Sequence, residues 1–226
     1  MNLKTRLVIR LVLLLTFLAA VLFLPAGSFR FWQAWPVLGL SILFNVLTGV
    51  YFYRRDPRLL ERRLLNKEER PEQKLLKLIW MPLWFLTFVV PGLDYRFGWS
   101  AAYLGGVPVW LTLLSQVILV SSWVLIFQVL KFNSFAATVV QVEAGQKVIS
   151  TGPYRIVRHP MYSAIVVTAV ATPLALGSYF AFAPALLMIP AFVLRLLNEE
   201  RVLRQELTGY AEYCLQTRFR LVPNIW

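Results

Sequence analysis

The sequence predicts an all-α, polytopic integral membrane protein with about six transmembrane helices. Of its 226 residues, 58% are hydrophobic and only 15% are charged, whereas soluble domains average about 45–50% apolar and about 25% charged residues. The mean hydropathy is +0.63. The apolar residues also gather in runs close to the length of about 20 residues that a transmembrane helix needs.

Six apolar runs follow one another along the chain. The first follows a basic N-terminus, as in a signal peptide, but no clear small-x-small cleavage site is present, so we expect an uncleaved helix. The last two runs meet at Leu-Gly-Ser-Tyr (176–179), a link so short that it predicts a tight helical hairpin, and we expect the last helix to continue to Gly209. The runs are Leu7–Leu24, Phe31–Tyr53, Leu75–Leu93, Ala102–Leu130, Met161–Gly177 and Tyr179–Leu197.

The basic residues are distributed unequally between the two sides of a six-span arrangement. Of the 23 lysines and arginines, only Arg30 and Arg96 fall on one side. The positive-inside rule therefore places both termini and the long loops in the cytoplasm. Topology and anionic lipid headgroups then account for the net charge of +12, so nucleic acid is not an expected partner.

Two loops on the basic side have distinct patterns. The loop at 54–77 is strongly charged, and its leucines at 59, 60, 64 and 65 recur at helical spacing. This pattern predicts a short amphipathic helix on the membrane surface. The segment 134–150 mixes polar and apolar residues around Glu-Ala-Gly, which predicts two short extended pieces around a turn. Long ordered loops of this kind are usually functional.

The stretch GPYRIVRHPMYSA contains the only histidine, His159, directly before Pro160 at the start of the fifth run. The predicted hairpin brings His159 beside Arg195 and Glu199, which share a helix face because they are four residues apart. Such a group could bind a base, an amine and a carboxylate. The alternative is an ordinary helical ion pair whose side chains reach the membrane interface.

Other kinds of site lack their residues in this sequence. One histidine and one cysteine, Cys214, cannot supply the usual zinc ligand sets, so no metal is expected. The sequence has no glycine-rich phosphate loop and no Gly-x-Ser-x-Gly elbow. Metal-free chemistry on an amphiphilic or membrane-borne substrate remains.

Four stretches together resemble the isoprenylcysteine carboxyl methyltransferase family, most of all its bacterial and archaeal members. They are TGPYRIVRHPMY, TPLALGS, NEERVL and RFRLVPNIW, in this order. The likeness covers about residues 133–226, and the earlier part of the chain matches only as generic membrane helices. We therefore expect N-terminal transmembrane helices over 1–130 and a methyltransferase core over 131–226, with a cofactor loop, the hairpin and a C-terminal segment.

The resemblance implies a methyltransferase that uses S-adenosyl-L-methionine in a cytoplasmic pocket, with a lipophilic substrate that enters from the bilayer of a bacterial plasma membrane. It implies that Arg195 is the catalytic and substrate-binding arginine, that Arg218 also binds the substrate, and that Arg220 lies near the same opening. Ala164 stands where the family pattern has glycine. The cofactor-binding positions it implies are Gln141, Gln146, Lys147, Val148, Ile149, Tyr154, His159, Pro160, Met161, Tyr162 and Glu199.

Methyl transfer to a carboxylate requires few catalytic side chains, which fits a site with one histidine and no metal. A sulfonium is an activated leaving group, and a carboxylate with an unperturbed pKa of about 4 is already a nucleophile at pH 7. Alignment and desolvation are then the main requirements. We therefore expect carboxyl O-methylation of a prenylcysteine-like or other lipophilic carboxylate.

Three alternatives remain open. The first is N-methylation of a phosphatidylethanolamine-type phospholipid, which would need a base such as Glu200. The second is an NADPH-dependent membrane reductase with a similar C-terminal arrangement. The third is a non-catalytic membrane protein in which the motif only stabilises the hairpin.

Overall fold

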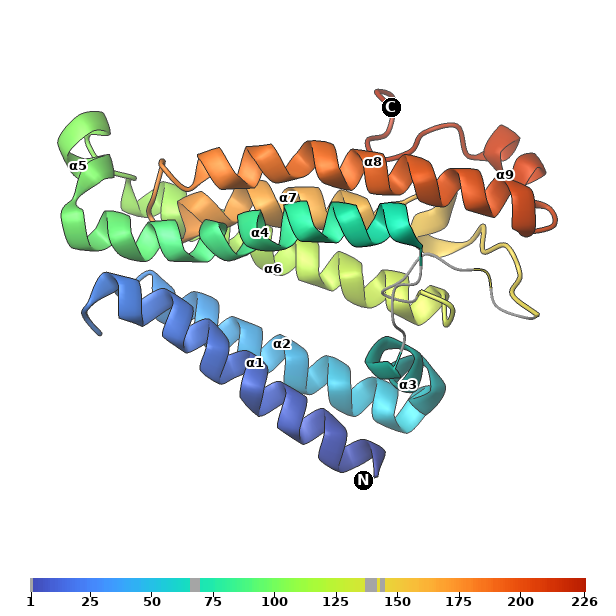
Figure 1. Ribbon diagram of the computed structural model, residues 1–226, viewed down its shortest axis with the longest axis horizontal. Coiled ribbons are helices and arrows are strands. Elements are labelled where there is room, and N and C mark those ends of the chain that lie inside the picture. Colours follow the sequence, from blue (N-terminus) through green and yellow to red (C-terminus); the bar gives the residue numbers. More distant parts are fainter. Residues whose placement is uncertain (1, 66–69, 137–141, 143–144) are drawn as a thin grey trace.

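The computed structural model describes residues 2–65, 70–136, 142 and 145–226, which form helices and loops but no strand (Figure 1). The predicted all-α class is confirmed. The long helices are α1 (Leu3–Ala26), α2 (Ala34–Arg55), α4 (Pro71–Phe97), α6 (Val109–Phe132) and α8 (Phe182–Glu206). The short ones are α3 (Pro57–Leu65), α5 (Trp99–Leu104), α7 (Pro160–Ala175), α9 (Tyr210–Gln216) and the 3-10 turn η1 (Gly152–Arg155).

Five of these helices, α1, α2, α4, α6 and α8, are long and apolar enough to cross a membrane. The fifth predicted run became α7, which has 16 residues and is therefore about 24 Å long. That is shorter than the hydrocarbon core of about 30 Å. Because α7 packs against α4, α6 and α8, most of its apolar surface is covered by protein, and Val167 and Val170 stay exposed. The chain is thus a polytopic membrane protein with one short internal helix.

Two predicted boundaries are wrong. The run Ala102–Leu130 is not one helix, because Gly105–Gly106 have positive φ angles and Pro108 precedes the first turn of α6. A left-handed backbone cannot continue a right-handed helix. The last long helix ends at Glu206 rather than at Gly209, whose φ of +85° places it at the start of α9.

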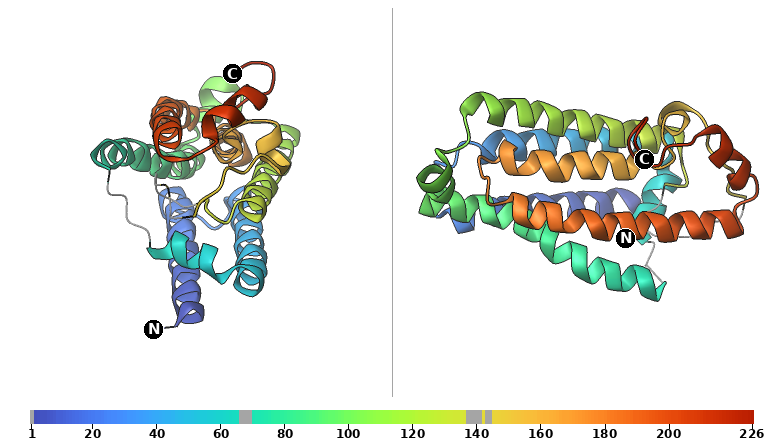
Figure 2. Two further views of the ribbon diagram at one scale, coloured as in Figure 1. Left: turned by 90° about the vertical axis from the view of Figure 1, so that its right-hand side faces the viewer. Right: turned by 90° about the horizontal axis from the view of Figure 1, so that it is seen from above.

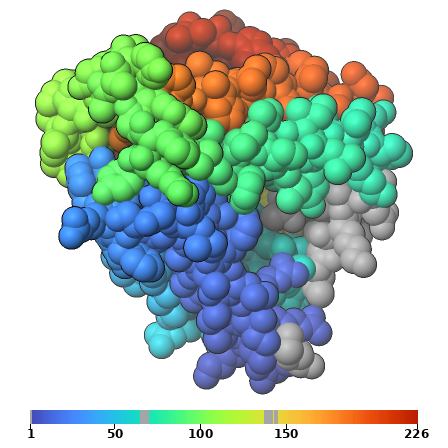
Figure 3. Space-filling view, turned by 60° about the vertical axis from the view of Figure 1, so that its left-hand side comes forward, coloured from blue at the N-terminus to red at the C-terminus, as the bar shows by residue number. Residues whose placement is uncertain are grey.

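The long helices and α7 form a closed ring. Going round it, α1 contacts α2, α2 contacts α6, α6 contacts α7, α7 contacts α8, α8 contacts α4 and α4 contacts α1; Figure 2 shows this ring from the end. At Gly92 a Cβ atom would lie 2.9 Å from the carbonyl oxygen of Leu22, so glycine allows α1 and α4 to touch there. Away from this contact the two helices diverge, and a recess opens between their surfaces (Figure 3).

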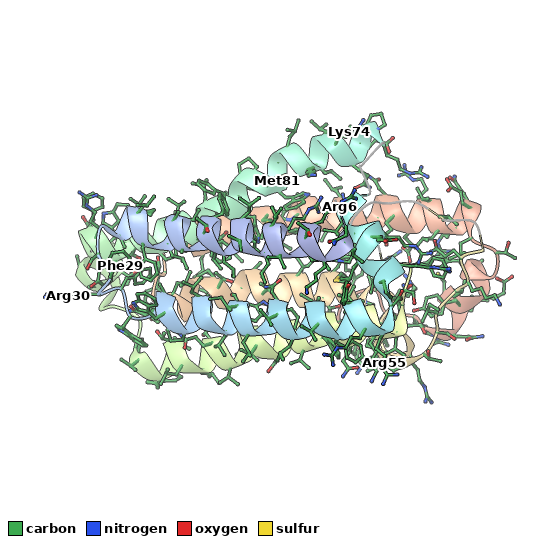
Figure 4. The ribbon with its side chains drawn as sticks, turned by 90° about the horizontal axis from the view of Figure 1, so that it is seen from below. Arg6, Phe29, Arg30, Arg55, Lys74 and Met81 are labelled. Atoms are coloured by element: carbon green, nitrogen blue, oxygen red, sulfur yellow. The ribbon has the colours of Figure 1, made fainter. Side chains whose placement is uncertain are left out.

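The charged residues gather at one end of this ring. Figure 4 places Arg6, Arg55 and Lys74 at the end that carries α3, and Phe29 and Arg30 at the opposite end. We call the first of these the basic end; it also holds α9. The predicted amphipathic helix is confirmed as α3. Its position toward the cytoplasm stays a prediction.

The opposite end holds the α7–α8 hairpin in place. The buried carboxylate of Asp94 accepts hydrogen bonds from the Ser100 backbone N–H (2.7 Å), the Ser100 hydroxyl and the Ser178 hydroxyl (2.5 Å). Hydrogen bonds to a charged group stabilise a fold by about 1.5–3 kcal/mol each. This cluster joins the end of α4 to the turn of the hairpin, and so fixes how α7 and α8 present their other ends.

Candidate active site

A cavity of about 690 Å³ lies inside the ring of helices, within the range of about 300–1,000 Å³ typical of ligand sites. Toward the middle of the bundle its lining is mainly apolar, with side chains from α1, α4 and α6 such as Leu14, Trp84, Phe88 and Trp123. We call this part the apolar bore. Toward the basic end the lining becomes polar and aromatic, and we call that part the polar chamber.

The structure brings most of the predicted site residues into the wall of this one cavity. They are Gln146, Lys147, Val148, Ile149, Tyr154, His159, Pro160, Met161, Tyr162, Arg195 and Glu199. Gln141 lies outside the described residues. Arg218 is exposed and does not line the cavity, so the structure gives its predicted substrate contact no support. Ala164 is fully buried, so its extra methyl group is accommodated.

The hairpin places the two predicted faces of α7 and α8 in contact. The Tyr162 hydroxyl of α7 donates a hydrogen bond of 2.6 Å to Oε2 of Glu199 on α8. One turn earlier, Arg195 is only 8% exposed, and its Nη1 donates a 2.9 Å hydrogen bond to Oε1 of Gln73 on α4. Sequence reasoning missed Gln73, because a pairing across 122 positions depends on how α4 is rotated against α8.

His159 stands at the N-terminus of α7 and is held from several sides. Its φ and ψ of −126° and 61° keep it outside the helical region, as Pro160 requires. Its backbone N–H donates to the carbonyl oxygen of Arg220 at 3.0 Å, and its Nε2 lies 3.4 Å from the Tyr210 hydroxyl. The ring is therefore fixed in the wall of the polar chamber.

Burial sets the protonation state of His159. Its side chain lies away from water, and this desolvation lowers its pKa from 6.5 to about 4, with Arg158 and Arg220 acting in the same direction and Glu200 opposing them. The imidazole is therefore neutral at pH 7. Its ring adds no positive charge to the chamber.

The lowered pKa of His159 predicts how the stability of the protein depends on pH. Because the folded pKa is below the unfolded one, the unfolded chain binds more protons between pH 6.5 and about 4. Stability should therefore be complete above pH 6.5 and fall toward pH 4, by up to about 3 kcal/mol. His159 is the only histidine, so NMR of a histidine-labelled sample in detergent micelles reports its midpoint directly. A midpoint near that of the denatured control, rather than near 4, would contradict the buried ring.

Tyr154 forms a second part of the chamber wall. Gly152, with φ +60°, begins the 3-10 turn that contains Tyr154. A Cβ atom at position 152 would lie 2.6 Å from Phe132 Cγ, so only glycine fits. Asn133 donates a hydrogen bond of 2.9 Å to the Tyr154 hydroxyl, and the Tyr213 hydroxyl donates to the Tyr154 carbonyl oxygen at 2.7 Å. Burial raises the pKa of Tyr154 well above 10, so its hydroxyl stays protonated.

Glu200 has a different surrounding from its neighbour Glu199. It is 4% exposed and lies outside the cavity wall. Its Oε1 is 2.7 Å from Arg158 Nε, and its Oε2 accepts a 2.8 Å hydrogen bond from Arg220 Nε. Arg158 also donates to the carbonyl oxygen of Arg218 at 2.9 Å. Glu200 therefore binds the C-terminal segment to the start of α7 and is not placed to act as a base on a bound substrate.

The helix α3 also reaches the site. Arg62 and Arg63 donate 2.9 Å hydrogen bonds to the carbonyl oxygens of Ser134 and Ala136. Arg63 and Ala136 both line the cavity. The amphipathic helix is thereby attached to the segment 134–136, which follows α6.

Comparison with known proteins gives one family match. Residues 108–208 match the model of the phospholipid methyltransferase family. This match supports a membrane methyltransferase. The matched region is a little under half of the chain and contains the Arg-His-Pro-x-Tyr motif, the hairpin and the Glu-Glu pair. No curated protein matches the sequence. A methyltransferase of this kind implies an S-adenosylmethionine-type methyl donor in general, and the match does not distinguish carboxyl from amine methylation.

Proposed function

We propose that the protein is an S-adenosyl-L-methionine-dependent methyltransferase that esterifies a lipophilic carboxylate, such as the carboxyl group of a prenylcysteine. The charge of the cavity wall carries this proposal. Among the described residues, four cationic side chains line the cavity, Arg63, Lys147, Arg158 and Arg195, and one anionic side chain does, Glu199; even with Arg158 compensated by Glu200 behind the wall, the cations are in excess. Such a wall favours an anionic substrate.

The donors and acceptors of the polar chamber fit the cofactor. Glu199 offers a carboxylate to an ammonium group or to ribose hydroxyls, and Tyr154, His159 and Tyr210 offer aromatic faces to a flat base. The neutral ring of His159 does not repel a positively charged sulfonium. When bound, the cofactor supplies an electrophilic methyl group on that sulfonium.

The remaining residues hold the substrate. The guanidinium of Arg195 can bind one carboxylate oxygen by a charge-assisted hydrogen bond, which leaves the other oxygen to attack the methyl carbon. The carboxylate is already ionised at pH 7, so no side chain has to remove a proton. The apolar bore next to Arg195 can hold a lipid tail, and its low polarity keeps water from the reacting oxygen.

The family match is equally compatible with a second candidate, N-methylation of a phospholipid amine. An ammonium group must lose a proton before it attacks. Among the described lining residues only Glu199 is acidic, and Glu200 is bound by Arg158 and Arg220 outside the wall. If Glu199 binds the cofactor, no second carboxylate among the described lining residues is available as a base, which supports the carboxylate substrate.

A labelled-methyl assay tests the proposal. Purified protein in detergent is given S-adenosylmethionine with a tritiated methyl group, together with either an S-farnesylcysteine analogue or phosphatidylethanolamine. We expect label in the acid, released as volatile methanol by alkali because it is an ester. Alkali-stable label on the ethanolamine headgroup would replace this proposal with N-methylation. No transfer, together with no calorimetric binding of S-adenosylhomocysteine, would reject both.

A further inference from the structure

A buried glutamine contacts the arginine of the polar chamber from outside the cavity wall. Gln73 lies in the first turn of α4 and is 1% exposed. Its Oε1 accepts the 2.9 Å hydrogen bond from Arg195 Nη1 across the α4–α8 interface. Gln73 does not itself line the cavity, so it can act on a substrate only through Arg195.

The charge of this partner matters more than its shape. A glutamine oxygen fixes the guanidinium without adding a negative charge. Arg195 and Glu199, one helical turn apart, sum to zero, so a carboxylate at position 73 would make the three groups net negative. A substrate carboxylate would then meet repulsion, and like charges in an interface cost several kcal/mol.

The other end of the same amide carries a cost in stability. Gln73 Nε2 is buried and has no hydrogen-bond partner within the described part of the chain. An unsatisfied buried donor costs about 1–3 kcal/mol. A glutamate would carry no such donor and would pair directly with Arg195, at the cost of burying a second charge.

We propose that Gln73 is a positioning residue: its amide oxygen orients Arg195 without adding a negative charge to the site. The site therefore binds a substrate with a carboxylate in preference to a neutral one. This inference rests on the proposed carboxyl methylation. Gln73 is not needed merely to attach α4 to α8. The two helices also pack through Trp80 of α4 and Phe192 of α8, whose ring centroids lie 5.3 Å apart, and Arg70 at the N-cap of α4 pairs with Glu206 of α8 at 2.8 Å.

Three variants separate these roles: Gln73→Glu, Gln73→Leu and, as the matched control at the N-cap of the same helix, Arg70→Gln. Calorimetry in detergent measures binding of an S-farnesylcysteine analogue, of its neutral amide and of S-adenosylhomocysteine. We expect the wild type to bind the acid about tenfold or more tightly than the amide. Gln73→Glu should bring this ratio close to one and raise KM about tenfold with kcat changed less than about threefold.

The other two variants give the complementary results. Gln73→Leu should keep the preference for the acid but lower kcat about tenfold or more, because the guanidinium loses its hydrogen bond and its fixed orientation. Arg70→Gln should match the wild type, because exposed ion pairs contribute only about 0–1 kcal/mol. S-adenosylhomocysteine affinity close to that of the wild type shows that each variant is folded.

An unchanged acid-to-amide ratio in Gln73→Glu would overturn the inference and leave the proposed function standing. If that variant does not fold, an unchanged kcat in Gln73→Leu would overturn it equally. A wild type that binds neither the acid nor S-adenosylhomocysteine would instead reject the proposed function.

Discussion

Replacing Arg195 with methionine should lower kcat/KM for carboxyl methylation by about 10²–10³-fold, while S-adenosylhomocysteine affinity stays within about threefold of the wild type. Arg195 is buried at the junction of the polar chamber and the apolar bore. Removing one partner of a buried, hydrogen-bonded charge pair costs about 2–5 kcal/mol, and each 1.36 kcal/mol is a factor of ten. Methionine keeps most of the apolar volume of the side chain. Steady-state kinetics and calorimetry on the same preparation measure the two quantities.

A double variant controls for damage to the fold. Arg195→Met leaves the Gln73 oxygen buried without its donor, which costs about 1–3 kcal/mol. Adding Gln73→Leu removes that oxygen and should recover part of the thermal stability without recovering activity. If Arg195→Met keeps full activity, Arg195 only packs the helices together. If it raises methyl transfer to a lipid amine instead, the cation opposes the true substrate and N-methylation is favoured.

Much of the fold followed from local features of the sequence. The short link between the last two apolar runs predicted the hairpin, and the hairpin predicted that His159, Arg195 and Glu199 come together at one end. The side-chain contacts of the structure agree, with Tyr162 and Glu199 2.6 Å apart. The unequal distribution of basic residues predicted which loops share an end of the bundle, because it depends only on the order of the apolar runs and loops along the chain. The roles of these residues stay predictions.

What the sequence could not predict depends on how helices are rotated against one another. The contact of Gln73 with Arg195 and the attachment of α3 to Ala136 join segments far apart in the chain. The break before α6 was also missed, since single glycines occur within membrane helices and only the positive φ angles at Gly105–Gly106 end this one.

The rotation of α8 also decides which of the two adjacent glutamates, Glu199 or Glu200, faces the cavity. Neighbouring residues of a helix differ by about 100° in direction, so one glutamate can line a site while the next cannot. In this structure Glu199 lines the cavity and Glu200 does not. We therefore expect Glu199→Gln and Glu200→Gln to affect different properties.

Glu199→Gln should weaken S-adenosylhomocysteine binding by about 10–100-fold, because a hydrogen bond to a charged group contributes about 1.5–3 kcal/mol. The melting temperature should change little, since the glutamine oxygen can still accept the hydrogen bond from Tyr162. Calorimetry and thermal melts in detergent measure the two effects.

Glu200→Gln should instead lower the melting temperature and leave ligand binding nearly unchanged. Arg158, itself 6% exposed, would lose the opposing charge that lies 2.7 Å away, and breaking a buried pair in this way costs about 3–5 kcal/mol. The folded fraction should bind S-adenosylhomocysteine within about threefold of the wild type, because Glu200 does not touch the cavity. Equal losses of ligand binding in both variants would mean that the Glu-Glu pair acts as one structural unit. The assignment of the polar chamber as the cofactor site would then lose its main anionic contact.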